Sequence, residues 1–276
     1  MEKARVLYIT HEMMPYMAEE TLMAKTTREL PQGMQEKGWE IRNFMPRFGS
    51  INERRYQLHE VIRLSGMNII VNDTDQPLVI KVASIPAGRI QVYFIDNEEF
   101  FKRKTLFHDE EKKFHADNDE RAIFYCKGVL ETVKKLGWVP DVIHVHGWMS
   151  SLVPFYVRTM YKNDPTFSNS KIVVSVYDED KFSETFHKDF AKKAAEGCPD
   201  ANLSELEKKA NYTGLISSSL RYADAIVKNG FTLDKEIQKV VKDSGMKVLE
   251  VDYEADYVET LNQFYTEILQ EETILG

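Results

Sequence analysis

The sequence has no glycine between Lys3 and Gly33. In that interval a short apolar run, Arg5–Thr10, is followed by a loop and then by a helical pattern that ends near Lys37. A strand followed by a helix is typical of the start of a doubly wound α/β domain, whose ligands bind at the carboxyl end of the first strand. Phosphate-binding versions need glycine in this loop, because backbone N–H groups must approach the anion. The missing glycines argue against a phosphate-binding loop here.

Cysteine and long apolar runs are also scarce. The two cysteines, Cys126 and Cys198, form no Cys-x-x-Cys motif, so we expect neither a metal site nor a disulfide framework. The sequence contains no run of about 18 apolar residues, the length that a membrane-spanning helix needs. The first five residues, Met-Glu-Lys-Ala-Arg, lack the apolar stretch of a signal peptide. We therefore expect a cytoplasmic protein with reduced thiols and no membrane partner.

Positive charge is not concentrated anywhere. The formal net charge is −8, and lysine and arginine occur in scattered pairs such as Arg54-Arg55 and Lys192-Lys193. Nucleic-acid binding needs a dense basic surface, so we expect no nucleic-acid partner. The 276 residues are 43% apolar and 11% aromatic, which is enough for a full core in one large or two small domains.

Short β-rich runs alternate with longer helical patterns, which favours a parallel sheet with helices on both faces. The predicted fold is α/β, a single Rossmann-like, doubly wound and mostly parallel sheet. Residues 60–95 interrupt the alternation as a hairpin-like excursion, with residues 72–77 and 86–88 as separators. The predicted strands are Val6–Thr10, Ile41–Met45, Val79–Ile85, Gln91–Ile95, Val142–His146, Ile172–Tyr177, Ala225–Val227 and Val248–Val251. The predicted helices are 20–37, 119–136, 150–161, 204–222, 233–243 and 254–270.

Several ordered motifs carry a family resemblance. They include Arg5–Tyr16, Glu29–Pro31, Gly38–Arg42, Met45–Gly49, Ile95–Phe101, Asp117–Tyr125, Pro140–Arg158, Lys171–Asp178 and Leu220–Val227. In this order they resemble the N-terminal starch synthase catalytic domain of bacterial glycogen and starch synthases, which are ADP-glucose-dependent glucosyltransferases. The resemblance covers about residues 4–237 and implies the fold of the N-terminal half of a GT-B type glycosyltransferase.

The residues that the family uses for chemistry are altered. The family writes its first loop Lys-Thr-Gly-Gly, where this chain has Met17–Ala24 with Glu19 and Glu20. The family motif His-Ala-His-Asp-Trp-His reads His144-Val-His-Gly-Trp-Met149 here, so Gly147 and Met149 replace an aspartate and a histidine. Tyr177 replaces the histidine of the family's Thr-Ile-His-Asn. We count these as four independent losses, and we expect no catalytic residue and no cofactor.

The family also has a second domain that holds the nucleotide sugar. After residue 237 this chain offers one strand and one amphipathic helix, so we expect that the second domain is lacking. By resemblance, the expected organisation is a Rossmann-like domain over 1–253 and a C-terminal helix over 254–276 that packs on the same domain. An ordinary terminal helix stays the alternative.

Six residues are candidates for ligand binding: His11, Glu12, Arg47, His144, His146 and Trp148. His11 beside Glu12 is an acid–base candidate, although Glu12, Glu19 and Glu20 would repel a diphosphate. We expect His144 and His146 to point to opposite faces of their strand and so not to share a metal.

Roles can also be predicted for one tryptophan and two arginines. Trp148 either stacks on a sugar ring or packs in the core. Arg47 is a candidate anion ligand at the end of the second strand. Arg121 is expected to position a helix by pairing with nearby carboxylates.

Three functions remain open. The first is a non-catalytic homologue, a pseudoenzyme of glycogen metabolism that binds an α-glucan or a partner such as a full-length synthase or a second copy. The second is the acceptor-side half of a split glycogen synthase. The third is a new activity that uses His11, Glu12 and His144. The losses favour the first, and we expect this chain alone to be inactive.

Overall fold

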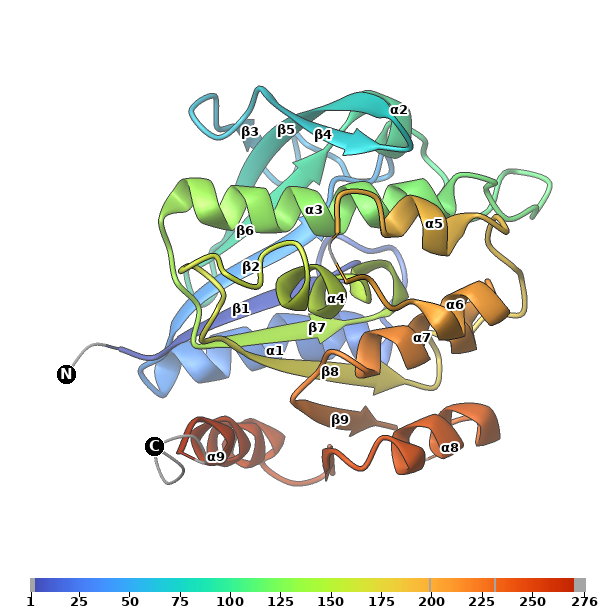
Figure 1. Cartoon of the computed structure of the whole chain (residues 1–276). Helices are drawn as coiled ribbons and strands as arrows, with labels where there is room; N and C mark the ends of the chain where they lie inside the picture. Colours follow the sequence, from blue (N-terminus) through green and yellow to red (C-terminus); the bar gives the residue numbers. More distant parts are fainter. Residues whose placement is uncertain (1–2, 199, 231, 271–276) are drawn as a thin grey trace.

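The computed structural model describes residues 3–198, 200–230 and 232–270. Within these ranges the strands form a ten-stranded mixed sheet with the order β10-β9-β8-β7-β1-β2-β6-β5-β3, and β4 pairs with β5. Figure 1 shows this sheet between two layers of helices. The predicted fold class, a doubly wound and mostly parallel α/β sheet, is confirmed.

Seven adjacent strands of the sheet are parallel to one another. They are β1 (Arg5–Thr10), β2 (Glu40–Pro46), β6 (Ile90–Asp96), β7 (Val142–His146), β8 (Lys171–Tyr177), β9 (Ala225–Asn229) and β10 (Lys247–Glu250). The chain order reverses at β1, which lies between β2 and β7. The carboxyl ends of β1 and β7 therefore flank the position where open α/β sheets bind ligands.

Alternate residues of the central strands enter two different cores. On β1, Val6 and Tyr8 pack with α1 (Leu22–Glu36) and α9 (Tyr257–Gln270). Leu7 and Ile9 pack on the other face, where the helices include α3 (Asn118–Leu136), α4 (Val153–Arg158) and α7 (Tyr212–Leu220). These near-continuous apolar strands are what a sheet covered on both faces requires.

The excursion before α3 is antiparallel. It contains β3 (His59–Glu60), β4 (Met67–Val71) and β5 (Thr74–Ile85), with β5 paired to β6. Asn72 and Asp73 make the turn between β4 and β5 with φ values of 50° and 57°, a conformation that these two residue types tolerate. The separator predicted over 72–77 is too long, because β5 begins at Thr74.

Three shorter helices and a 3-10 turn complete the carboxyl end of the sheet. They are α5 (Phe190–Ala194), α6 (Ser204–Lys208), α8 (Lys235–Asp243) and η1 (Trp148–Ser150), and α2 (Glu98–Phe101) follows β6. The helix predicted over 204–222 is two helices, because Asn211 caps the second one by accepting from the Gly214 N–H at 3.0 Å.

The helix α9 packs against α1 and the sheet through Leu261, Phe264, Tyr265 and Ile268. The last part of the predicted segment 254–276, residues 271–276, lies outside the described residues. In the part of the chain that the structure describes, none of the helices has both the length and the apolar content needed to cross a bilayer.

Candidate functional site

The loop after β1 is fixed by its own side chains. Thr21 caps α1 by accepting from the Ala24 N–H at 3.0 Å, and its hydroxyl donates to Glu12 Oε2 at 2.5 Å. The Thr27 hydroxyl donates to the Glu12 carbonyl at 2.6 Å. Glu12 is therefore a structural partner of the α1 cap, and its side chain is 17% exposed.

The turn after β7 is built around Gly147 and His11. Gly147 has φ 79° and ψ 163°, a backbone conformation that L side chains rarely adopt. A Cβ at this position would lie 2.2 Å from His11 Cε1 and 2.9 Å from Met23 Sδ. The imidazole of His11 thus fills the space that a side chain at 147 would need, and it is 1% exposed.

Two consecutive carboxylates in the loop after β8 reach back across the ends of β7 and β1. Glu179 accepts from the first two N–H groups of α1, those of Leu22 at 3.2 Å and Met23 at 2.7 Å. Asp180 accepts from the Trp148 N–H at 2.7 Å and lies 3.3 Å from His11 Nε2. Neither residue was predicted from the sequence. A run of three acidic residues, Asp178–Asp180, directly after a predicted strand was the available signal.

Opposing electrostatic effects act on the pKa of His11. Burial opposes the charged imidazole, but the hydrogen bond to Asp180 and the negative charges of Asp180 and Glu12 outweigh it, so the pKa of His11 is raised above its ordinary value. The two carboxylates thus favour the charged form of this buried imidazole.

His144 and His146 lie on the same face of β7, with ring centroids 4.0 Å apart. The expectation that they point to opposite faces is wrong, because side chains two residues apart on a strand share a face. His144 hydrogen bonds to the Tyr265 hydroxyl at 2.5 Å and to the Ser175 hydroxyl at 2.8 Å. Burial lowers the pKa of both histidines, that of His146 to about 3. Among the described residues, no three His, Cys, Asp or Glu side chains form a group that could hold a metal.

The three altered family positions all lie in the interior. Tyr177 is 1% exposed, and its hydroxyl hydrogen bonds to His146 Nδ1 at 2.8 Å. Met149 is fully buried, and its carbonyl accepts from Cys126 Sγ at 3.2 Å. Gly147 is also buried. These positions contribute to packing and leave no polar side chain of their own at the surface.

Trp148 lies in an aromatic cluster and is 2% exposed. The centroid of its ring is 5.0 Å from that of Phe107, 5.4 Å from that of Phe186 and 5.5 Å from that of Phe182. Because its side chain is almost completely buried, the indole offers no accessible face on which a sugar ring could stack.

Both arginines make contacts within the protein. Arg47 forms ion pairs with Asp96 at 3.0 Å and Glu53 at 3.3 Å, so its charge is already balanced. Arg121 donates to the carbonyls of Phe100 and Leu106 and to Asn118 Oδ1. The expected pairing of Arg121 with carboxylates is therefore wrong; its hydrogen bonds fix the loop before α3.

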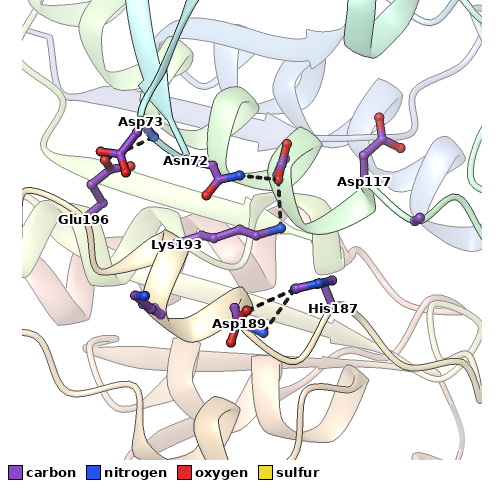
Figure 2. A pocket seen from close by; sticks show the side chains of 10 residues that line it. Asn72, Asp73, Asp117, His187, Asp189, Lys193 and Glu196 are labelled. Atoms are coloured by element: carbon purple, nitrogen blue, oxygen red, sulfur yellow. Dashed lines mark hydrogen bonds and ion pairs between the residues drawn. The ribbon is translucent and has the colours of Figure 1, made fainter.

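Two cavities are relevant to ligand binding. One of about 980 Å³ lies beside the carboxyl ends of β8 and β9 and is lined in part by Asp178, Phe182, Thr232 and Gln238. The other, of about 660 Å³, lies between the β4–β5 turn, the start of α3 and α5 (Figure 2). Its Lys193 already pairs with Asp119 at 2.8 Å and Glu120 at 2.7 Å.

Comparison with known proteins gives this geometry a family context. Residues 5–250 match the starch synthase catalytic domain family. The chain belongs to this family. It is 37% identical over 234 residues to a glycogen synthase of Chlorobium limicola, with 82% of this chain and 48% of the relative covered. It is 36% identical over 238 residues to a glycogen synthase of Chlorobium phaeobacteroides, again with 82% and 48% covered.

The fold has a solved counterpart. The catalytic domain of starch synthase IV from Arabidopsis thaliana, bound to ADP and acarbose, superposes with a TM-score of 0.72 at 15% identity. The match covers 90% of this chain and 51% of that one. This chain thus spans about half the length of the glycogen synthases it matches, in agreement with the resemblance to an N-terminal catalytic domain.

Proposed function

We propose that this starch synthase domain is a non-catalytic homologue that binds an α-glucan. The observation that supports the proposal is the burial of Gly147, Met149 and Tyr177 at the positions where the family resemblance places polar site residues. A thioether neither donates a strong hydrogen bond nor carries charge. Tyr177 uses its hydroxyl on His146 inside the core.

The charges at the same edge of the sheet also disfavour glucosyl transfer by this domain. Transfer from a nucleotide sugar places negative charge on the leaving diphosphate, which cations must stabilise. Here the carboxylates of Glu12, Glu179 and Asp180 surround the start of α1 and the turn after β7. The His11 imidazole already interacts with the carboxylates of Asp180 and Glu12.

The proposed glucan site is the cavity beside β8 and β9. It combines the half-buried ring of Phe182 with oxygen and amide groups of Asp178, Thr232 and Gln238. Nine of the eleven lining residues are polar or charged, and such groups can hydrogen bond to the hydroxyls of a sugar. An aromatic ring suits the apolar face of a pyranose.

Calorimetric titration of the purified chain with a linear malto-oligosaccharide, beside ADP-glucose, tests the proposal. We expect heat from the oligosaccharide only. Asp178→Asn and Gln238→Ala should each weaken the affinity for the oligosaccharide by about tenfold, because each removes a hydrogen bond to the bound ligand. Asp189→Asn, in the cavity of Figure 2, is the matched control and should bind as the unaltered chain does.

ADP-glucose binding at comparable strength would contradict a non-catalytic role and would revive the split-enzyme alternative. The absence of binding heat with both ligands would contradict glucan binding. A full-length synthase or a second copy of this chain as partner stays a prediction, and a pull-down or sedimentation experiment would then test it.

A further inference from the structure

A third cavity, of about 630 Å³, lies between α8 and β10. It belongs to the margin of the sheet where α8 follows β9, in the lower part of Figure 1. Its lining includes four lysines, Lys228 on β9 and Lys235, Lys239 and Lys242 on α8. The chain as a whole has a net charge of −8. The fold therefore concentrates positive charge at this margin, although lysine and arginine are scattered along the sequence.

The lysines of α8 form one exposed face of that helix. Spacings of four and three residues place Lys235, Lys239 and Lys242 along one side, and all three are exposed. Ile237 and Val241 are buried on the opposite side. Within the described ranges none of the three lysines forms an ion pair. Their charges are therefore available to a partner.

The strand β10 has one free edge. It comes first in the strand order and pairs with β9, and the Val251 N–H donates to the Lys228 carbonyl at 3.1 Å. Successive residues of a strand direct their backbone groups to opposite edges, so the N–H and C=O groups of Val248 and Glu250 face away from β9. Among the described residues no other segment pairs with these groups. An edge of this kind can accept a further strand.

The side chains of the same two residues line the cavity beside α8. Val248 is 38% exposed, and Glu250 already pairs with Lys228 at 2.8 Å. One further carboxylate, that of Asp243, lines the cavity. An extended peptide beside β10 would direct alternate side chains toward this cavity. Carboxylates at those positions would be attracted by the lysines of α8.

We propose that the free edge of β10 and the lysine face of α8 form a docking surface for an extended acidic segment of a partner protein. The segment adds to the sheet as a strand. Main-chain hydrogen bonds to Val248 and Glu250 supply affinity, and the lysines select acidic side chains. A nucleic acid or an anionic membrane would use the lysines but not the backbone groups of the strand.

The docking surface goes beyond the proposed function and fails separately from it. Lys239 and Lys242 line this cavity and not the cavity proposed to bind glucan. Substituting them therefore leaves the lining of the glucan cavity unchanged.

The test is fluorescence anisotropy with a labelled synthetic peptide that alternates glutamate and valine. The ionic strength is held constant, because salt screens the attraction between exposed charges. Lys239→Gln/Lys242→Gln should weaken peptide binding at least about tenfold. The matched control is Lys102→Gln/Lys104→Gln, which removes two positive charges from exposed residues of the loop after α2. It should bind the peptide as the unaltered chain does.

A second probe separates strand addition from charge attraction alone. The same peptide with all its backbone amides N-methylated keeps its carboxylates but cannot donate hydrogen bonds to β10. We expect it to bind at least about tenfold more weakly than the unmethylated peptide. Equal binding of the two peptides would overturn the proposal, and so would equal affinity in the lysine variant and the unaltered chain. Absence of peptide binding, or tighter binding of a single-stranded oligonucleotide or of anionic phospholipid vesicles, would also overturn it.

Discussion

A Cβ on Gly147 would lie 2.2 Å from Cε1 of His11. Real Cβ atoms do not approach other atoms so closely, so the buried imidazole and a side chain at 147 exclude each other. The glycine at position 147 is therefore what allows the imidazole of His11 to occupy this interior position.

Gly147→Ala should destabilise the protein by more than about 3 kcal/mol, because the strained backbone and the steric contact with His11 add together. Gly137→Ala is the matched control. Gly137 also has a positive φ, 62°, but nothing lies within 4 Å of its Cβ position. It should lose only about 1–2 kcal/mol. Urea denaturation measures both free energies of unfolding. Similar losses in the two variants would show that the His11 contact carries no energy.

The hydroxyl of Tyr265 joins α9 to the interior of the sheet. It hydrogen bonds to His144 at 2.5 Å and to the Tyr8 hydroxyl at 3.3 Å, and all three residues are fully buried. Tyr265→Phe leaves both partners without this bond in a dry interior, which should cost about 1–3 kcal/mol.

Tyr257→Phe is the control for this prediction, since Tyr257 lies on the same helix and donates to Glu29 at 2.9 Å in an exposed setting. It should change stability by less than about 0.5 kcal/mol. Thermal or urea unfolding distinguishes the two. If the control lost as much free energy of unfolding as Tyr265→Phe, the effect would come from α9 in general and not from the buried hydroxyl.

The buried histidines of β7 predict an acid-sensitive fold. Burial lowers the pKa of His146 to about 3 and lowers that of His144 well below its ordinary value. The unfolded chain binds protons at both residues below about pH 6.5, whereas the folded chain does not. The free energy of unfolding should therefore fall as the pH drops from about 6.5 toward 3. His146→Gln, which keeps an acceptor for Tyr177, should flatten this decline.

His11 provides the opposite case in the same molecule. Its raised folded pKa means that its stabilising contribution is fully present below about pH 6.5 and is lost as the pH rises through the folded value. His11→Gln should therefore flatten the change on the alkaline side and leave the acid decline in place. Identical pH profiles for the His146 and His11 variants would contradict these assignments.

The sequence by itself determined the fold and the family. Apolar runs such as Arg5–Thr10 and Val142–His146 are strands because their residues are buried on both faces of the sheet. Local signals also placed the ends of α1 and α3 to within about two residues, which is the usual uncertainty of helix boundaries. The two-residue period of a strand also predicts that His144 and His146 share a face, and our expectation of opposite faces misapplied that period.

Only the tertiary structure decided the state of the site. Leu22 and Glu179 are 157 positions apart, and their contact exists because β8 lies two strands from β1 in the sheet. No local pattern indicates that a carboxylate after β8 will cap α1, or that His11 will fill the space beside Gly147. Propensity and periodicity act over a few residues, whereas the parallel sheet brings together loops that are distant in sequence, and their packing determines which polar groups remain accessible.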